Sequence, residues 1–315
     1  MKKVLLIAGG GTLGTYTGEE LLRLGCAVDV ICPEEKHSNH PHLRFIQSLA
    51  TDEILKELFA EQKYDGIVNF IHYKSLAEYR RIHSLLISNT EHLIFLSSYR
   101  VYADQEHPIT EDSPRLYDIS QDEDFLANED YAVPKSQCED FLKNECRGQN
   151  WTIVRPVISF SQYRLDLYVH SGKKVLEYPK AGKVFYIPAS SRYLTAGLDW
   201  SGNSGKLIAN LLFKSNTYGE AYTVSSAQNL TWDEVAAIYG ELTGVKVEWC
   251  SDEQFLDRYP QFRDRSKWML IYDRMFDRKI DNSKILAATG LKREDFTTIR
   301  EGVSAELAKL RQRER

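Results

Sequence analysis

The sequence lacks the features that would place the chain in a membrane or crosslink it by disulfide bonds. The apolar run near the N-terminus, residues 4–8, ends in three glycines, whereas a secretory signal needs about 7–15 apolar residues. No stretch approaches the roughly 20 apolar residues of a membrane span. The five cysteines are odd in number and form no C-x-x-C pair, so neither a zinc ribbon nor a thioredoxin-type redox pair is indicated. We therefore expect a soluble, cytoplasmic protein with reduced thiols and no membrane partner.

A bias of charge is absent as well. The 315 residues include 40 Lys and Arg against 45 Asp and Glu, a formal net charge of −5, which gives no sign of nucleic-acid binding. Hydrophobic residues make up 43% of the chain, which excludes disordered and fibrous classes. At about 150 residues per domain, the length predicts two domains or one large one. His37, His40 and His42 share one loop, but no carboxylate or thiol is spaced to complete a metal shell, so we predict no metal site.

Short apolar runs alternate with helical patterns through the first half of the chain. The runs are rich in β-branched and aromatic residues and nearly continuous in hydrophobicity, which is typical of strands buried on both faces of a parallel sheet. Strand–helix alternation of this length predicts a Rossmann-type, doubly wound α/β sheet. The predicted strands are 4–7, 28–31, 43–46, 66–71, 93–97 and 152–155, and the helices are 18–24, 52–61, 76–87 and 135–146.

The pattern loosens after residue 156 and becomes regular again only past residue 200. The elements predicted there are a helix at 206–213, a strand at 222–224, a helix opened by the capping box of Thr231 and Glu234, and a terminal helix at 297–315. We predict a dinucleotide-binding domain over 1–160, to which segments near 185–230 return. Residues 161–315 then form mainly a smaller α/β substrate domain.

A glycine-rich loop follows the first predicted strand and opens a helix. Gly9, Gly11 and Gly14 fit G-x-G-x-x-G, in which the chain turns tightly and its backbone approaches a pyrophosphate. Free N–H groups at the start of the helix then bind the anion. Because the motif lies in the required strand–turn–helix context, we predict that this loop, with Thr12 and Leu13, binds a dinucleotide.

The acidic residue that would bind the adenosine ribose of NAD is missing at the end of the second strand. Cys32 occupies its position and is followed by Pro33, Glu34, Glu35 and Lys36. Either glutamate would serve NAD, whereas Lys36 would meet the 2′-phosphate of NADP. Both cofactors therefore stay open, with NAD slightly favoured.

A serine, a tyrosine and a lysine complete a catalytic pattern. Ser98 follows the fifth predicted strand, while Tyr131 and Lys135 are four residues apart and project from one helix face. A lone Y-x-x-x-K is common by chance, but its combination with Ser98 and the glycine loop is much more specific. A tyrosine base working near neutrality needs its pKa lowered by about 3 units, roughly 4 kcal/mol. A lysine ammonium within a few ångströms supplies much of this.

Together these features resemble the extended short-chain dehydrogenase/reductases, and within them the NAD-dependent epimerase/dehydratase family acting on nucleotide sugars. The resemblance implies that Tyr131 is the acid/base, that Lys135 binds the nicotinamide ribose and lowers the tyrosine pKa, and that Ser98 hydrogen-bonds the reacting oxygen. It also implies a nucleotide-sugar substrate and, by analogy, a homodimer. The matching segments are residues 2–14, Ser98-x-x-Val101-Tyr102, Tyr131-x-x-x-Lys135 and Arg155-Pro156.

Several positions depart from that family's pattern. Its first loop glycine is Ala8 here, and its small residues after the fourth strand are Ile71 and His72. His72 ends a strand, where ligands bind, so we predict a cofactor contact; a partly buried, hydrogen-bonded histidine is the alternative. Dehydratases of the family place Asp-Glu where this chain has Tyr99-Arg100, which disfavours 4,6-dehydration and leaves epimerisation or ketone reduction.

The substrate contacts that we predict are Ser98, Tyr99, Arg100, Arg164 and Arg274. Guanidinium groups bind phosphate bidentately, so Arg274 is the preferred clamp for a diphosphate. An ordinary charged surface is the alternative, because the later arginines are interleaved with aspartates. We predict an NAD(P)-dependent nucleotide-sugar epimerase or 4-ketoreductase that binds no nucleic acid. The alternative is a non-catalytic member of the same fold that binds nucleotide or RNA and has a regulatory role.

Overall fold

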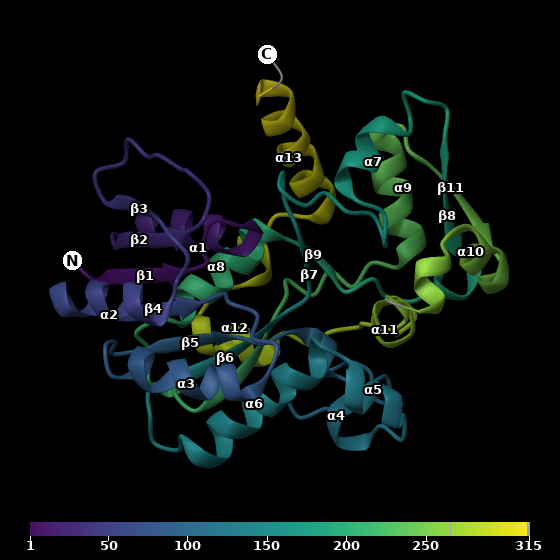
Figure 1. Cartoon of the computed structure of the whole chain (residues 1–315). Helices are drawn as coiled ribbons and strands as arrows, with labels where there is room; N and C mark the ends of the chain where they lie inside the picture. The colour runs from purple at the N-terminus through teal and green to yellow at the C-terminus, as the bar shows by residue number, and fades with distance from the viewer. Residues whose placement is uncertain (265, 314–315) are drawn as a thin grey trace.

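Seven parallel strands form the central sheet of the computed structural model, which describes residues 1–264 and 266–313. The strand order is β10-β6-β5-β4-β1-β2-β3. The chain adds strands on one side of β1 as far as β3 and then on its other side from β4 onward, as in a doubly wound Rossmann sheet. The fold class predicted from the sequence is therefore confirmed (Figure 1). The strands are β1 (Lys3–Ile7), β2 (Ala27–Cys32), β3 (Leu43–Gln47), β4 (Gly66–Asn69), β5 (Leu93–Leu96), β6 (Trp151–Pro156) and β10 (Glu220–Val224).

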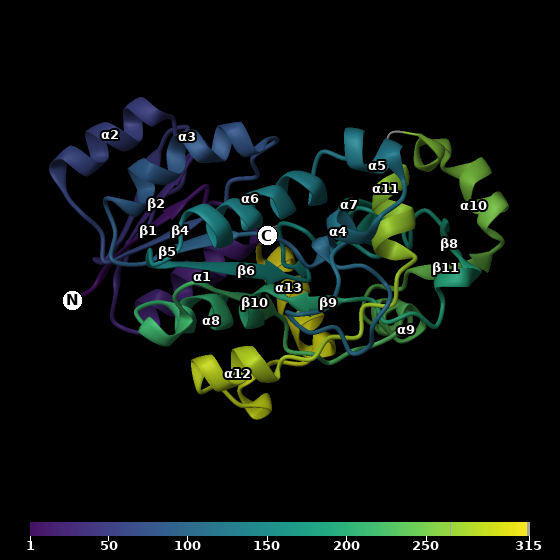
Figure 2. The same cartoon turned by 90° about the horizontal axis from the view of Figure 1, so that it is seen from below.

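Helices cover both faces of this sheet, as Figure 2 shows. Successive side chains of a strand point to opposite faces, so Val4 and Leu6 of β1 join one apolar core while Leu5 and Ile7 join the other. This two-sided burial explains the continuous apolar runs in the sequence. The helices of the first face are α1 (Thr12–Arg23), α8 (Ser201–Leu211) and α12 (Ser283–Thr289), and those of the second are α2 (Asp52–Glu61), α3 (Leu76–Ile87) and α6 (Ala132–Glu145).

Helix α6 begins at Ala132 rather than residue 135, and two other helices begin five or six residues earlier than the sequence pattern predicts. The first starts at Thr12 rather than residue 18, and α8 starts at Ser201 rather than residue 206. Their first turns contain glycine and small polar residues, which hide the apolar periodicity. In α8 the turn is held by Asn203, whose Nδ2 donates to Asp199 Oδ1 at 2.8 Å.

The C-terminal half has its own apolar core, which lies beside the sheet (Figure 1). Its short strands form two parallel pairs, β7 (Ile158–Phe160) with β9 (Leu198–Trp200) and β8 (Val184–Pro188) with β11 (Lys246–Cys250). The remaining helices are α4 (Leu116–Ile119), α5 (Glu123–Asn128), α7 (Gly172–Glu177), α9 (Trp232–Thr243), α10 (Asp252–Arg258), α11 (Lys267–Met269) and α13 (Ile299–Arg313). No helix within 1–264 and 266–313 is both long and apolar enough to cross a membrane.

A buried ion pair ties α6 to β6. Arg155 donates from Nε to Glu139 Oε1 at 2.8 Å and from Nη2 to Oε2 at 2.6 Å. Its Nη1 also donates to the Tyr102 hydroxyl at 2.9 Å. Arg155 is 1% exposed and Glu139 is fully buried. Burial alone would raise the pKa of Glu139, but the guanidinium of Arg155 lowers it to about 2.

Candidate functional site

The glycine loop presents an open helix end. Gly11 precedes α1, and the first backbone bond from the helix to this loop is donated by Thr15 to Gly11 O at 3.0 Å. The N–H groups of Thr12, Leu13 and Gly14 donate to no residue that the structure describes, and the first turn contains no acidic side chain. The positive end of the helix dipole is therefore unneutralised, as a phosphate-binding helix requires.

The glycines of the loop have different structural roles. A Cβ on Gly14 would collide with the backbone of Gly9, so Gly14 allows α1 to pack closely against the loop. A Cβ on Gly11 would meet no atom within 4 Å, so the space in front of it is open to a ligand. Ala8, where the family pattern has glycine, has a φ of 56°, in the left-handed region that favours glycine.

These two roles give a prediction that separates binding from folding. Gly14→Ala should lower the free energy of unfolding by about 2 kcal/mol, because backbone must shift to admit the methyl group. Gly11→Ala should change it by less than about 0.5 kcal/mol, yet weaken NAD binding about 10-fold, the equivalent of 1.4 kcal/mol. Urea unfolding and calorimetric titration with NAD measure the two effects. Wild-type affinity in Gly11→Ala would show that no phosphate approaches this loop.

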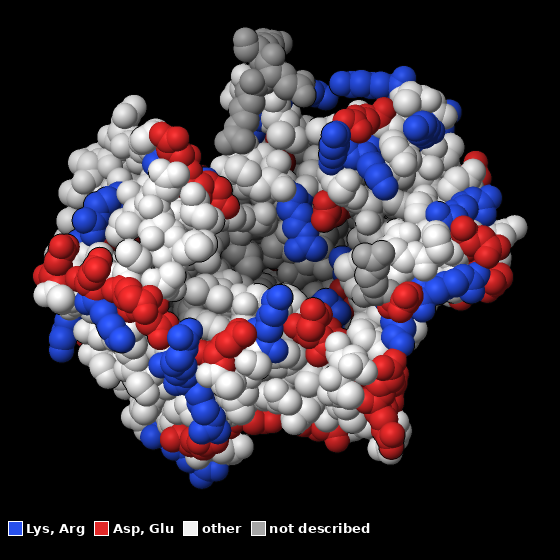
Figure 3. All heavy atoms as spheres, viewed as in Figure 1, with Lys and Arg blue, Asp and Glu red and all other residues white. Residues whose placement is uncertain are grey.

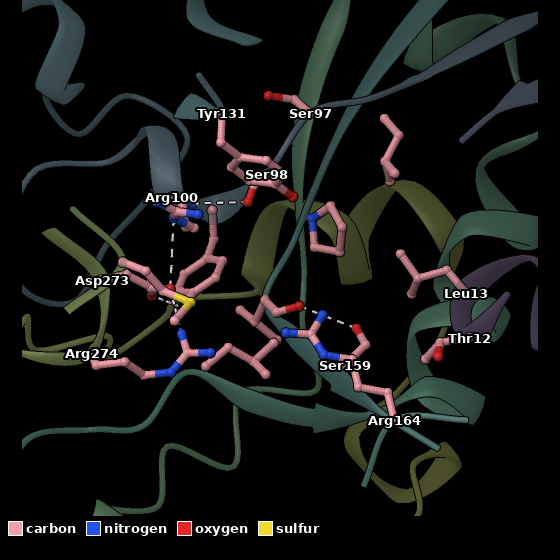
Figure 4. A pocket seen from close by; sticks show the side chains of 16 residues that line it. Thr12, Leu13, Ser97, Ser98, Arg100, Tyr131, Ser159, Arg164, Asp273 and Arg274 are labelled. Carbon is pink, nitrogen blue, oxygen red and sulfur yellow. Dashed lines mark hydrogen bonds and ion pairs between the residues drawn. The ribbon is translucent and has the colours of Figure 1, made fainter. Parts of the chain in front are cut away.

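The loop opens into a cavity of about 210 Å³ at the carboxyl ends of β5 and β6 (Figure 4). Figure 3 shows that the molecule is hollowed between its two halves, with acidic and basic side chains on the rim. The predicted residues that line the cavity are Thr12, Leu13, Ser98, Tyr99, Arg100, Tyr131, Arg164 and Arg274. One cavity thus combines the helix end, the predicted acid/base and every predicted substrate contact.

Tyr131 is held at the start of α6 by a buried carboxylate. Glu129 Oε2 accepts the backbone N–H groups of Tyr131 at 2.9 Å, Ala132 at 2.5 Å and Val133 at 3.0 Å. These bonds satisfy orphan donors of the first helical turn and fix where the tyrosine leaves the helix. Ser98 is 4% exposed, and its Oγ accepts the backbone N–H of Arg100 at 3.2 Å.

Lys135 lies beneath Tyr131, outside the cavity wall. Its side chain is 2% exposed, and its Nζ donates to Leu96 O at 2.6 Å. Nζ is 5.3 Å from the centre of the Tyr131 ring. Burial lowers the pKa of Lys135 because the ammonium loses hydration. The lysine is therefore positioned to act on Tyr131 electrostatically.

His72 also packs against Tyr131. The two ring centres are 4.9 Å apart, and burial together with the Lys135 charge lowers the pKa of His72. With Ile71 it lines a second cavity, at the ends of β3 and β4. The histidine therefore lies next to Tyr131, and its contact with a cofactor stays a prediction.

The end of β2 also lies against the glycine loop. Cys32 is 1% exposed and outside the cavity. A Cβ on Gly10 would lie 2.8 Å from both Cys32 Cβ and Glu34 Oε2, and Lys36 Nζ donates to Gly10 O. The residues present thus fit the diphosphate and nicotinamide ribose of a dinucleotide, while at the adenosine end a glutamate and a lysine replace the usual single carboxylate.

Asp273 is the cavity residue that the sequence analysis missed. It is 3% exposed, accepts the Tyr99 hydroxyl and pairs with Arg274. The guanidinium groups of Arg274, Arg100 and Arg278 outweigh the effect of burial and lower the pKa of Asp273. The available sequence signal was its position next to Arg274, the predicted diphosphate clamp. Within the described ranges, no group of three or more His, Cys, Asp or Glu could hold a metal ion.

Comparison with known proteins gives the same fold. No family model matches the chain. UDP-glucose 4-epimerase from Neisseria meningitidis serogroup B is 31% identical over 142 residues, which span 36% of this chain and 42% of that protein. The structure of UDP-glucose 4-epimerase from Thermotoga maritima with UDP-glucose superposes with a TM-score of 0.69 at 15% identity, covering 99% of this chain and 100% of the other. The enzyme WbmH of Bordetella bronchiseptica, in complex with NAD+, gives a TM-score of 0.68 at 18% identity and covers 99% of both chains. The resemblance read from the sequence motifs is therefore confirmed at the level of fold.

Proposed function

We propose that this chain is an NAD-dependent epimerase or 4-ketoreductase acting on a nucleotide sugar, and a divergent member of the epimerase/dehydratase family. The observation that carries the proposal is the cavity in which Ser98 and Tyr131 face the open end of α1. Support also comes from the structural neighbours, of which one holds UDP-glucose and another NAD+. If NADP binds instead, Lys36, whose Nζ donates to Gly10 O, is the group that would meet the 2′-phosphate.

The cofactor would be held by the N–H groups that begin α1 and by Lys135 below Tyr131. When bound, a nicotinamide supplies the acceptor and donor of a hydride. The chain's own contribution is to move the proton. The Tyr131 phenolate accepts the proton of the substrate hydroxyl and later returns it, Ser98 Oγ holds the same oxygen, and the Lys135 ammonium stabilises the phenolate.

Arg164 and Arg274 are the groups placed to hold a diphosphate. Both line the cavity, and Arg274 is oriented by donating from Nε to Tyr168 O at 2.9 Å. Arg164 pairs with Asp166 at 3.0 Å but is half exposed, so a ligand can reach it. Two guanidinium groups match a diphosphate in charge and in geometry.

The first test is to denature the purified protein and identify the nucleotide that it releases. We expect NAD or NADH, together with a rise in Tm when a UDP-, dTDP-, GDP- or CDP-sugar is added to the native protein. Arg274→Met should abolish the shift given by the sugar. Arg192→Met, which removes an exposed arginine paired with Asp233, should retain it. Binding of nucleotide or RNA without any response to nucleotide sugars would favour the non-catalytic alternative.

A further inference from the structure

Arg100 lies directly beside the predicted acid/base. Its Cζ is 4.7 Å from the centre of the Tyr131 ring, and it follows Ser98 by two residues in the turn after β5. Figure 4 shows Arg100 next to Ser98 and Tyr131, whereas Arg164 lies at the far side of the cavity. The cavity therefore has an arginine beside Tyr131, in addition to the two arginines that we assign to a diphosphate.

The charge of Arg100 is only partly matched. Nη2 donates to Glu129 Oε1 at 3.1 Å, while Nε is buried without a hydrogen bond, 3.7 Å from Asp273 Oδ2. Nη1 donates to no residue in the described part of the chain. Both carboxylates have other partners, because Glu129 holds the start of α6 and Asp273 is shared with Tyr99 and Arg274. Arg100 thus keeps an unused donor edge although its side chain is only 16% exposed.

The surrounding arginines have carboxylates near them but keep unpaired donors. Glu129 and Asp273 face Arg100, Asp273 pairs with Arg274, and Asp273 and Asp104 act on Arg278. Arg278 is 1% exposed, and its Nε, like that of Arg100, lacks a hydrogen-bond partner. A buried donor without a partner is costly, and an anionic group of a ligand at Arg100 would accept from the free donor edge of this guanidinium.

We propose that the substrate is a nucleotide-linked uronic acid, whose carboxylate is bound by Arg100. This inference rests on the proposed function. In a pyranose that reacts at C4, the diphosphate at C1 lies across the ring from the reacting carbon, and we assign it to the side of the cavity where Arg164 lies, away from Tyr131 and Ser98 (Figure 4). C6 is attached to C5, the neighbour of C4, and a C6 carboxylate offers two oxygens in the plane that guanidinium recognises. A neutral hydroxymethyl group at C6 offers no charged acceptor to the free donor edge of Arg100.

Calorimetric titration of the NAD-supplemented protein with matched sugar pairs tests the inference. The pairs are UDP-glucuronate with UDP-glucose and GDP-mannuronate with GDP-mannose. We expect one uronate to bind at least 10-fold more tightly than its neutral partner, because a hydrogen bond to a charged group contributes enough free energy for a difference of this size. Arg100→Met should remove this preference and change the affinity for the neutral sugar less than about threefold. Arg80→Met, which removes a surface arginine paired with Glu145, should retain the preference.

The outcomes separate this inference from the function on which it rests. Equal affinity within each pair, or a preference that survives Arg100→Met, would overturn the carboxylate assignment and leave the proposed function standing. Failure of these four sugars and of the dTDP- and CDP-sugars to bind would overturn both. Should Arg100→Met fail to fold, Arg100→Lys keeps the charge beside Glu129 and Asp273. It should keep a reduced preference for the uronate, because ammonium cannot bind a carboxylate bidentately.

Discussion

Replacing Tyr131 with phenylalanine is expected to lower kcat about 1,000-fold, within the range for loss of a general acid/base. The variant keeps the ring and with it the packing against His72 and Arg100. It lacks the hydroxyl that exchanges the proton with the substrate oxygen. The affinities for NAD and for the nucleotide sugar should therefore stay within about threefold of wild type, since 0.65 kcal/mol corresponds to that factor. Steady-state kinetics and calorimetric titration give both quantities.

A second tyrosine provides the control for this loss. Tyr193 is 74% exposed and lies outside the cavity, so Tyr193→Phe should retain wild-type kcat. Turnover by Tyr131→Phe at a rate comparable to wild type would show that another group moves the proton.

Replacing Arg155 with methionine is expected to lower the free energy of unfolding by about 3–5 kcal/mol, because it leaves the other member of a buried ion pair without its partner. Glu139 would remain fully buried, and Arg115 Nη1 at 3.3 Å and the Lys143 ammonium would offset only part of its charge. Urea unfolding at neutral pH measures the loss. Arg300→Met breaks an exposed pair with Glu241 and should cost less than about 1 kcal/mol.

The same ion pair predicts the direction of the pH dependence. Because the pKa of Glu139 is lowered from an ordinary 4.5 to about 2 in the fold, the native state binds its proton less readily than the unfolded state does. The stabilisation is therefore complete above about pH 4.5 and is lost as the pH falls toward 2. Much of this acid-dependent loss should disappear in Arg155→Met, and an unchanged pH profile would contradict the assignment.

The sheet was predictable because its inner strands bury both faces, which leaves apolar runs in the sequence that end at polar or glycine positions. The edge strand β3 is only partly buried, but it keeps an apolar pattern. The structure of the segment 156–193 could not be predicted, because its elements are short and depend on contacts with other parts of the chain. The ring of His170, for example, stacks on Phe185 at 4.2 Å, a contact between residues of an irregular loop and β8. The spacing of apolar residues along the sequence does not indicate such a contact.

The residues of the site likewise include some that the sequence could predict and some that it could not. Ser98, Tyr131 and Lys135 belong to spaced motifs, so their roles could be proposed from the sequence and its resemblance to a family. Asp273 could not be found in this way, because it reaches Tyr99 and Arg100 only when a distant turn folds over the end of β5. The free donor edge of Arg100 is likewise a result of the fold.

Proton NMR of the protein with NAD and each nucleotide sugar tests the central claim most directly. We predict that one sugar is converted into a product whose ring-proton couplings report an inverted carbon, and that Tyr131→Phe, although it binds the same ligands, forms none. For a 4-ketoreductase the equivalent result is reduction of a 4-keto sugar with NADH. Nucleotide sugars that bind the wild-type protein and stay unchanged under both conditions would contradict the account.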